Sequence, residues 1–383
     1  MARALYIHWP FCLKKCPYCD FNSHVRSSVD HDIWLGSMLS DMRHEAKYST
    51  HERLDSIFFG GGTPSLMPPT LVESLLHEAE RLWGFSDAIE ITLEGNPSSV
   101  EAENYADLAK AGINRASLGL QSLDDAQLAF LGRLHNASEG LAALDVAQKH
   151  FNRVSFDLIY ALPDQTTAQW EAILDRAIGL GTGHLSLYQL TIEPGTRFAT
   201  DVRNGGFTPL DNDLAAELFV ITRSMTKQAG LPAYEISNHA AAGQESRHNL
   251  TYWRYADYYG IGPGAHGRRG GIATIRHRKP ENWLDAIRQH GHGIAQEHSL
   301  GVAEQLSEAI LMGLRLEEGI DLEALASRFG TSASDLVNPD KRDLFIRLGL
   351  LHRKGKRLGL TDKGMPLLDA VLADLVSDAL VTS

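Results

Sequence analysis

Three cysteines lie in one short segment near the start of the chain, and the 383-residue sequence contains no others. Their spacing is Cys12-x3-Cys16-x2-Cys19. An odd, clustered set does not suit a disulfide framework, whereas thiolates are soft ligands for zinc and for iron–sulfur clusters. Three thiolates on a four-iron cube leave one iron without a protein ligand, and that iron can chelate a small molecule through an amine and a carboxylate. The spacing therefore predicts a 4Fe-4S cluster held by these cysteines.

Two other interpretations of the cysteines stay open. Cys16-Pro-Tyr-Cys19 alone is a dithiol redox motif of the glutaredoxin type, but this interpretation gives Cys12 no role. Structural zinc is the other, because His8 or His24 could complete a Cys3His tetrahedron. Zinc does not account for the glycine-rich segment Gly60-Gly61-Gly62-Thr63-Pro64. Glycines let a backbone approach a ligand closely and present its polar groups, although such a run can equally be a tight turn that ends a strand.

Repeated strand-then-helix units must position these residues. Apolar runs typical of strands lie at 4–8, 56–59, 90–94, 115–119, 154–159 and 184–188. Amphipathic patterns typical of helices lie between them at 32–48, 69–83, 101–111, 138–150 and 168–179. Six such units with right-handed crossovers predict an α/β fold, a partial (β/α)6 barrel like a TIM barrel. The loops after its strands, which carry the cysteines and the glycine-rich segment, would form the active face.

The second half of the chain changes character twice. We expect the barrel core to cover 1–235, a connecting region to cover 236–300, and a separate C-terminal domain to cover 301–383. A segment rich in Tyr, His and Gly runs from 234 to 277. In the last part, helical patterns at 303–317, 322–329 and 344–351 precede a basic hairpin at 352–360 and a final helix from Lys363. This order predicts a helical, winged-helix-like domain.

Composition excludes some classes of protein. Lys and Arg number 36 against 48 for Asp and Glu, a formal charge of −12 that repels a phosphate backbone. We therefore expect no nucleic-acid partner, and a DNA-binding regulator that uses the winged-helix-like end is the least favoured hypothesis. No stretch approaches the roughly 20 apolar residues of a membrane-spanning helix, and the first residues lack a signal-peptide pattern. These features predict a cytoplasmic protein.

The cysteine spacing, with Tyr18 before the third cysteine, resembles the signature of the radical S-adenosylmethionine superfamily, and the glycine-rich segment is similar to its glycine motif. Motifs at 6–12, 94–97, 118–122, 132–133 and 157–163 resemble, more narrowly, the oxygen-independent coproporphyrinogen III oxidase family. By position, this resemblance implies that S-adenosylmethionine contacts Tyr6, Tyr18, Gly61, Gly62, Thr63, Glu94, Gln121, Arg133 and Asp157.

The chemistry of these residues fits that ligand. Glu94 or Asp157 can accept hydrogen bonds from ribose hydroxyls or an ammonium, and Arg133 can pair with a carboxylate. Each also has an ordinary structural explanation. Glu94 could cap the next helix, Arg133 could be a solvated surface charge, and Asp157 could be a satisfied polar group in the barrel mouth.

Two branches of the family differ near the cysteines. The oxidases carry a further cysteine two positions after the third, and this sequence has Phe21 there. They also have an N-terminal arm before the first strand, whereas the first strand here begins at Ala4. His248-Asn-Leu-Thr-Tyr252-Trp253 resembles the His-Asn-x-x-Tyr-Trp motif of the haem-chaperone branch, HemW. A neutral imidazole is a good axial ligand of haem iron, and the aromatic rings could stack on the macrocycle. His266 is a weaker second candidate, and a core aromatic cluster in which His248 caps a helix is the alternative.

The resemblance thus implies a haem chaperone that binds haem through His248, together with a 4Fe-4S cluster and S-adenosylmethionine, and passes haem to acceptors such as respiratory haem proteins. The alternative is an enzyme that decarboxylates coproporphyrinogen III oxidatively to protoporphyrinogen IX by radical chemistry. The resemblance also implies a cluster-dependent homodimer and peripheral membrane contact. No strongly basic amphipathic helix is evident, so protein partners would make any such contact.

Overall fold

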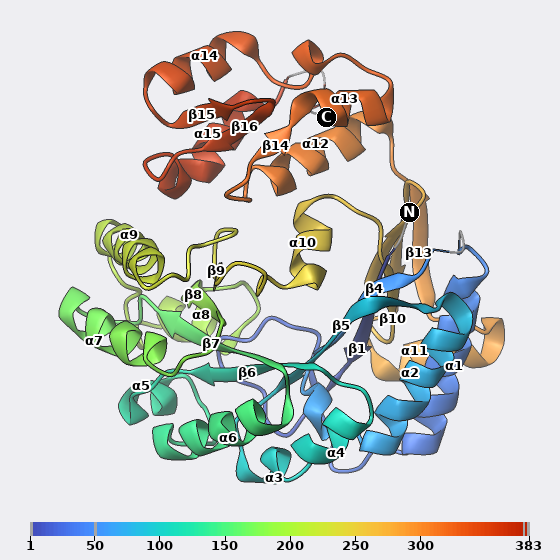
Figure 1. The fold of residues 1–383 in the computed structure, drawn as a ribbon. Coiled ribbons are helices and arrows are strands. Elements are labelled where there is room, and N and C mark those ends of the chain that lie inside the picture. Colours follow the sequence, from blue (N-terminus) through green and yellow to red (C-terminus); the bar gives the residue numbers. More distant parts are fainter. Residues whose placement is uncertain (1–2, 50–51, 378–379, 381–383) are drawn as a thin grey trace.

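The six predicted strand–helix units build the barrel in a computed structural model, which describes residues 3–49, 52–377 and 380 (Figure 1). The six parallel strands, in spatial order, are β1 (Ala4–Trp9), β4 (Leu54–Gly61), β5 (Phe85–Gly95), β6 (Arg115–Gln121), β7 (Arg153–Tyr160) and β8 (His184–Gln189). Strand β10 (Tyr259–Ile261) adds a parallel strand beside β1, and β9 (Asn238–Ala240) adds an antiparallel one beside β8. The predicted α/β fold and partial barrel are confirmed.

Helices cover the outer face of this sheet (Figure 1). They are α1 (His31–Ala46), α2 (Pro69–Trp83), α3 (Ser99–Ala102), α4 (Tyr105–Lys110), α5 (Asp125–Phe130), α6 (Ala137–His150), α7 (Thr167–Ile178) and α9 (Asn212–Gln228). Helix α8 (Arg197–Arg203) packs instead on the cysteine segment, where the Phe198 N–H donates to the Pro17 carbonyl (3.0 Å). The single helix predicted at 101–111 is wrong, because two short helices replace it. Ser98 caps the first by accepting from the Glu101 N–H, and the chain re-enters a helix after Asn104.

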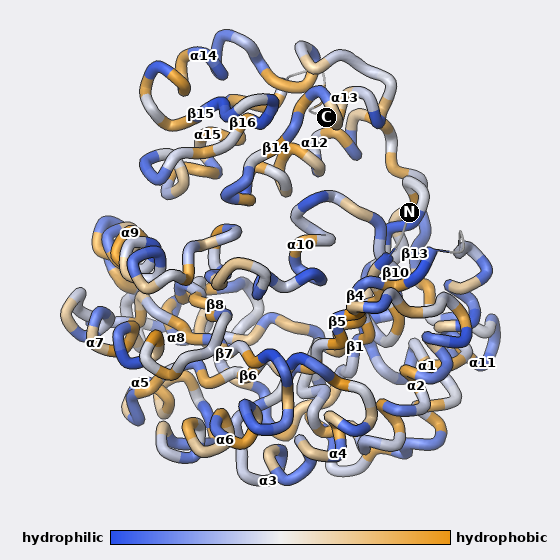
Figure 2. Tube along the Cα trace, viewed as in Figure 1, coloured by the Kyte–Doolittle hydropathy of each residue, from blue (hydrophilic) through white to orange (hydrophobic). Residues whose placement is uncertain are grey.

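The main core lies between the sheet and these helices. Strand residues such as Leu5, Ile57 and Phe59 are completely buried against helix residues such as Met38 and Val72. Figure 2 shows the same division, with hydrophobic colour concentrated along the strands and alternating colours along the outer helices. This packing supplies most of the hydrophobic stabilisation and holds the carboxyl ends of the strands together at one edge.

Residues after the barrel return to it as a second layer. Helix α10 (Arg247–Trp253) precedes β10, and an antiparallel sheet follows from β11 (His266–Arg269), β12 (Ile272–Arg276) and β13 (Ile294–Ser299), with α11 (Pro280–His290) between the last two. A buried ion cluster joins this sheet to α1. Arg276 contacts Asp41 at 2.6 Å and Glu45 at 2.9 Å, and Arg269 contacts Glu45 at 2.9 Å.

The C-terminal part has a hydrophobic core of its own, above α10 in Figure 1. Its elements are α12 (Val302–Gly313), β14 (Ile320–Asp321), α13 (Leu322–Phe329), α14 (Pro339–Arg347), β15 (Leu351–Lys354), β16 (Arg357–Leu360) and α15 (Leu368–Leu375). The three strands form one sheet, so the winged-helix-like fold is confirmed. The helix predicted at 344–351 begins earlier, at the Asn338 cap and Pro339, and ends before Gly349, whose φ is 70°.

Short elements complete the barrel mouth. Strands β2 (Phe11–Cys12) and β3 (His24–Val25) pair with each other around the cysteine segment. Across the described ranges, no helix is long and apolar enough to cross a membrane.

Candidate functional site

The three cysteines lie at the carboxyl ends of the barrel strands, where the fold predicts an active face. Cys12 is the last residue of β2. Cys16 and Cys19 lie in a turn in which the Cys19 N–H donates to the Cys16 carbonyl (3.2 Å). All three thiols are partly exposed. The Thr63 hydroxyl donates to Cys12 Sγ (3.4 Å) and Arg133 Nη1 donates to Cys16 Sγ (3.4 Å). Burial raises the pKa of Cys12 and of Cys19, so hydrogen bonds of this kind are needed to favour the thiolates.

One pocket gathers nearly every residue predicted to bind the cofactors, and we call it the cysteine pocket. Its lining includes Cys12, Cys16, Tyr18, Cys19, Gly61, Gly62, Thr63, Glu94, Gln121, Arg133 and Asp157. Residues from the ends of β4, β5, β6 and β7 thus meet around the cysteine segment. Of the predicted set, the lining lacks Tyr6 and His248.

The glycine-rich segment packs directly on the cysteine segment. The Gly62 N–H donates to the Trp9 carbonyl (2.7 Å), and the Thr63 N–H donates to the Phe11 carbonyl (2.8 Å). A Cβ on Gly62 would lie 2.6 Å from the Phe11 carbonyl oxygen, closer than real Cβ contacts allow. Gly61 has a φ of 114°, which favours glycine. The glycines therefore allow the backbone after β4 to pack closely on the backbone at 9–11, which positions the cysteine segment beside β4.

Two partly buried carboxyl groups face this pocket. Burial, with Asp157 nearby, raises the pKa of Glu94 to about 8, and burial raises the pKa of Asp157 to about 6 against the opposing effect of Ser186 and Arg115. Glu94 accepts from the Gly61 N–H (3.2 Å), so it lies on the pocket wall rather than capping a helix. A cationic ligand would favour the ionised form of both carboxyl groups. The pair suits an ammonium or sulfonium group.

Arg133 is a structural link across the pocket, not a solvated surface charge. Its Nη2 donates to Asn96 Oδ1 (2.6 Å) and to the Gly119 carbonyl (2.8 Å), and its Nη1 reaches Cys16. Its buried Nε has no protein partner within the described chain, which leaves a donor for a ligand. Asn96 also donates to the Thr63 hydroxyl (3.0 Å). Sequence reasoning gave Asn96 no role, although it stands inside the motif at 94–97.

Tyr6 faces a second pocket, of about 380 Å³, which we call the tyrosine pocket. Its lining is Tyr6, His8, Phe21, Asn22, Gly61, Glu94, Tyr252, Tyr258, Gly264, His266 and Arg278. It shares Phe21, Gly61 and Glu94 with the cysteine pocket. The two pockets therefore adjoin at the position where the oxidases carry a further cysteine, and Phe21 is 61% exposed there.

His248 lies behind the tyrosine pocket rather than in it. Its side chain is buried, Nδ1 contacts the Ser56 hydroxyl (3.3 Å), and Nε2 contacts the Tyr252 hydroxyl (2.6 Å). The ring stacks on Phe58, with centroids 4.9 Å apart. Burial, reinforced by Arg115, lowers the pKa of His248 to about 3, so the imidazole is neutral. Tyr252 thus separates the predicted haem ligand from the space that a ligand could enter.

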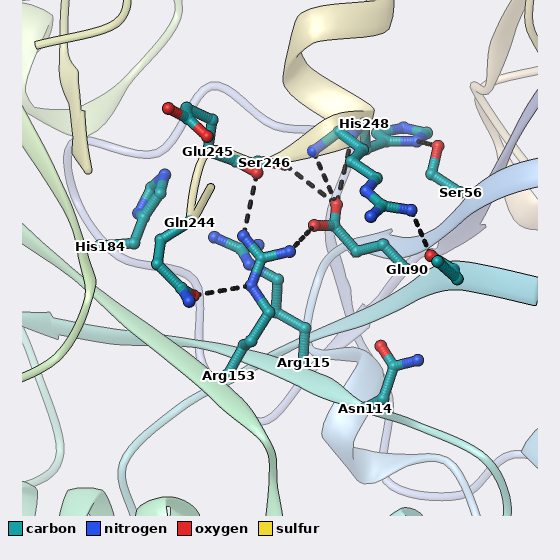
Figure 3. Close-up of polar contacts among 12 residues, drawn as sticks. Ser56, Glu90, Asn114, Arg115, Arg153, His184, Gln244, Glu245, Ser246 and His248 are labelled. Carbon is teal, nitrogen blue, oxygen red and sulfur yellow. Dashed lines mark hydrogen bonds and ion pairs between the residues drawn. The ribbon is translucent and has the colours of Figure 1, made fainter. Parts of the chain in front are cut away.

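Glu90 fixes the start of α10 and with it His248 (Figure 3). Its carboxylate accepts from the backbone N–H groups of Arg247 (2.9 Å) and His248 (3.3 Å), and it pairs with Arg153 at 2.7 Å. Ser246 caps the helix by accepting from the Asn249 N–H. His248 is therefore inside a capped first turn, and its ring is held by packing as well as by hydrogen bonds.

The described side chains do not form a site for a single metal ion. In the part of the chain that the structure describes, no group of three or more His, Cys, Asp and Glu side chains is placed to hold one metal ion. The ring of His8 is engaged on both sides, by the Tyr6 hydroxyl and the Asn22 carbonyl (2.9 Å each). Thiolates of a cubane cluster bind separate irons, so they need only surround a common space, as the three cysteines do.

Comparisons with known proteins agree with this geometry. A family model described as "Radical SAM superfamily" matches residues 6–177, and one described as "HemN C-terminal domain" matches residues 302–367. "Radical S-adenosyl methionine domain-containing protein 1, mitochondrial" of Mus musculus is 42% identical, over 97% of this chain and 87% of its own length. "Heme chaperone HemW" of Bacillus subtilis is 34% identical, over 94% of this chain and 96% of its own.

A second protein with that name, from Escherichia coli, is also 34% identical, over 96% of this chain and 97% of its own. Among solved structures, coproporphyrinogen III oxidase (HemN) from Escherichia coli superposes with a TM-score of 0.82 over 97% of this chain and 89% of that one. The two share 20% sequence identity, so this match establishes the common fold alone.

Proposed function

Because this chain belongs to the radical S-adenosylmethionine superfamily, and within it to the family of the haem chaperone HemW, we propose that it binds haem and passes it to acceptor haem proteins. The observation that carries the proposal is the tyrosine pocket, which offers aromatic walls and imidazole groups directly beside the cysteine pocket. Respiratory haem proteins are the proposed acceptors.

The cysteine pocket is the proposed site of a 4Fe-4S cluster and S-adenosylmethionine, because its lining combines three thiols with hydrogen-bond donors and acceptors. Cys12, Cys16 and Cys19 would hold the cluster, whose fourth iron would chelate the amine and carboxylate of S-adenosylmethionine and could supply one electron. Thr63 and Arg133 stabilise two of the thiolates by donating hydrogen bonds to sulfur. The unpartnered Arg133 Nε is a donor that a bound ligand would satisfy.

The other proposed S-adenosylmethionine contacts have separate tasks. Glu94 and Asp157 offer acceptors for ribose hydroxyls or an ammonium, and Gln121 offers an amide from the end of β6. Gly61 and Gly62 bring backbone to the pocket, and Tyr18 places a ring beside Cys16. Tyr6 contributes from the adjoining tyrosine pocket, where its hydroxyl is held by His8.

His248 stays a predicted haem-binding residue, but direct ligation has a structural requirement. The 2.6 Å contact with Tyr252 must break and the Tyr252 ring must rotate before iron can reach Nε2. Without this rotation His248 can act on bound haem only indirectly. It holds the hydroxyl of Tyr252, and Tyr252 lines the pocket.

The experiment is anaerobic reconstitution followed by two assays on the same preparation. In the first, haem is added and the loaded protein is mixed with an apo-cytochrome; we expect stoichiometric haem uptake and a time-dependent transfer spectrum. In the second, coproporphyrinogen III, reductant and S-adenosylmethionine are added; we expect no protoporphyrinogen IX. Turnover in the second assay without haem uptake in the first would overturn the chaperone proposal.

Two further elements of the proposal concern assembly. The protein is proposed to form a homodimer that depends on the cluster and to touch membranes only peripherally, through protein partners. Light scattering of the reconstituted protein before and after chelation of the iron tests the first, and flotation with acceptor-free vesicles tests the second.

A further inference from the structure

The tyrosine pocket contains an imidazole, that of His266, to which the described residues give no hydrogen-bonding role. His266 is the first residue of β11, is exposed, and lines this pocket. Among the described residues, its side chain makes no hydrogen bond or ion pair. Partial desolvation by the pocket wall and the nearby Arg278 lower its pKa, which favours the neutral ring that can donate to a metal. His248, by contrast, has both nitrogens engaged.

The loop before His266 is held at several points, so the imidazole is placed in advance. The Gly262 N–H donates to Asp41 Oδ2 (3.1 Å), the Asn22 amide donates to the Pro263 carbonyl (2.9 Å), and the Arg276 N–H donates to the Ala265 carbonyl (3.0 Å). Gly262 and Gly264 have φ values of 92° and 80°. A ligand that is fixed before binding loses little conformational entropy when it binds.

Arg278 supplies an uncompensated positive charge to the same pocket. The three arginines of the adjoining sheet, at 268, 269 and 276, all contact carboxylates within 4 Å. Arg278 has no such carboxylate partner in the described part of the chain, while the Asn22 amide fixes its backbone carbonyl at 2.9 Å. A guanidinium without a carboxylate partner, beside aromatic walls, suits a ligand carboxylate, which it can bind through two parallel hydrogen bonds.

Aromatic rings form much of the remaining lining, together with polar groups such as Glu94 and Asn22. Tyr252 and Tyr258 pack edge to face with centroids 4.5 Å apart, and Phe21 is exposed at the side shared with the cysteine pocket. The volume of about 380 Å³ lies within the ~300–1,000 Å³ typical of ligand sites. Aromatic walls, a metal-donor nitrogen and a carboxylate-binding group together match a flat metalloporphyrin with propionates.

We propose that the tyrosine pocket is the haem site, with His266 donating a ring nitrogen to the iron and Arg278 pairing with a propionate. This inference rests on the proposed function and names the site through which it acts. The assignment needs no rotation of Tyr252, whereas ligation by His248 does. The bond formed is a coordinate bond from a neutral imidazole, so no electron or proton leaves the protein.

The test is a titration of the full, reconstituted chain with ferric haem, followed by absorption and electron paramagnetic resonance spectra. His266→Ala should remove the histidine-ligated signature and weaken haem binding at least tenfold, and added imidazole should restore the signature. His298→Ala is the matched control, because His298 lies exposed on β13 of the same sheet and lines neither pocket. Iron and sulfide content verifies that each variant is folded and loaded.

A second arm tests the propionate contact. Arg278→Gln should weaken the binding of haem severalfold but leave the binding of haem dimethyl ester unchanged, because the ester has no charge to pair. A His266→Ala spectrum identical to that of the wild type, or loss of the signature in His248→Ala alone, would overturn the assignment. If the wild type takes up no haem at all, the chaperone function itself fails, which is a different result.

Discussion

Asp41→Asn should destabilise the barrel severely, although it replaces one oxygen by an NH2 group in a side chain that lines neither pocket. Asp41 is completely buried on α1, and its carboxylate accepts four hydrogen bonds. The donors are Arg276 Nε (2.6 Å), Trp283 Nε1 (3.3 Å) and the N–H groups of Gly262 and Gly293 (3.1 Å each). One side chain thus connects α1 to the loop of the proposed haem site, to β12 and to α11.

The magnitude follows from the charge balance of this cluster. Arg276 pairs with Asp41 and Glu45, and Arg269 pairs with Glu45 and with the partly exposed Glu297. Asparagine removes the shorter of the two ion pairs of the completely buried Arg276 and turns an NH2 group toward donors. Breaking a buried ion pair by removing one partner costs about 3–5 kcal/mol, so we expect the free energy of unfolding to fall by that amount.

Urea unfolding followed by tryptophan fluorescence measures the change. Five of the six tryptophans belong to the main core, so the signal reports chiefly the barrel. The sixth, Trp253, lies on α10 against the C-terminal part. Trp34 and Trp283 stack beside Asp41 with centroids 5.2 Å apart. Asp285→Asn is the control, since Asp285 pairs with Arg288 in solvent and its loss should cost less than about 1 kcal/mol. Equal midpoints for both variants would refute the reasoning.

Three further predictions concern the site itself. Gly62→Ala should lower the free energy of unfolding by about 1–3 kcal/mol, because the added Cβ would press on the Phe11 backbone. Gly36→Ala is the control: a Cβ at this position of α1 meets no neighbour, so alanine should raise the free energy of unfolding by about 0.5–1 kcal/mol. Thermal melts compare the two variants. The raised pKa of Glu94, about 8, means that the folded state binds a proton more tightly than the unfolded state, so stability of the ligand-free protein should fall as pH rises from about 5 to 8. Glu94→Gln should flatten this dependence of the urea midpoint on pH, and an unchanged slope would exclude Glu94 as its source. Cys16→Ser should abolish most iron and sulfide uptake in anaerobic reconstitution, and full loading of this variant would contradict a three-cysteine cluster.

The fold and the cysteine pocket were predictable because their signals are local. Strand periodicity placed the six barrel strands, and the rule that loops after parallel strands share one edge placed Cys12, Glu94 and Asp157 near each other. The division of the helix predicted at 101–111 depends on the Ser98 cap, which competes with a continuous apolar pattern. Local sequence patterns therefore predicted which helices and strands exist better than the residues at which they begin and end.

The position of His248 was not predictable, because its surroundings come from distant parts of the chain. Ser56 on β4 and Glu90 on β5 meet α10 only after the barrel has formed. The sequence motif marks His248 and Tyr252 together but does not reveal that the tyrosine stands between the histidine and the pocket. Arg278 escaped notice for the same reason, since an arginine in a loop carries no signal until its neighbours are known.

Asn22 joins the cysteine segment to the loop of the proposed haem site. The residue stands three positions after Cys19, and its side-chain amide donates to the carbonyls of Pro263 and Arg278 (2.9 Å each) while its own carbonyl contacts His8. The cysteine segment is thus itself one of the supports that hold the His266 loop in position. A change in the backbone after Cys19 would therefore be felt at the neighbouring pocket through a single side chain.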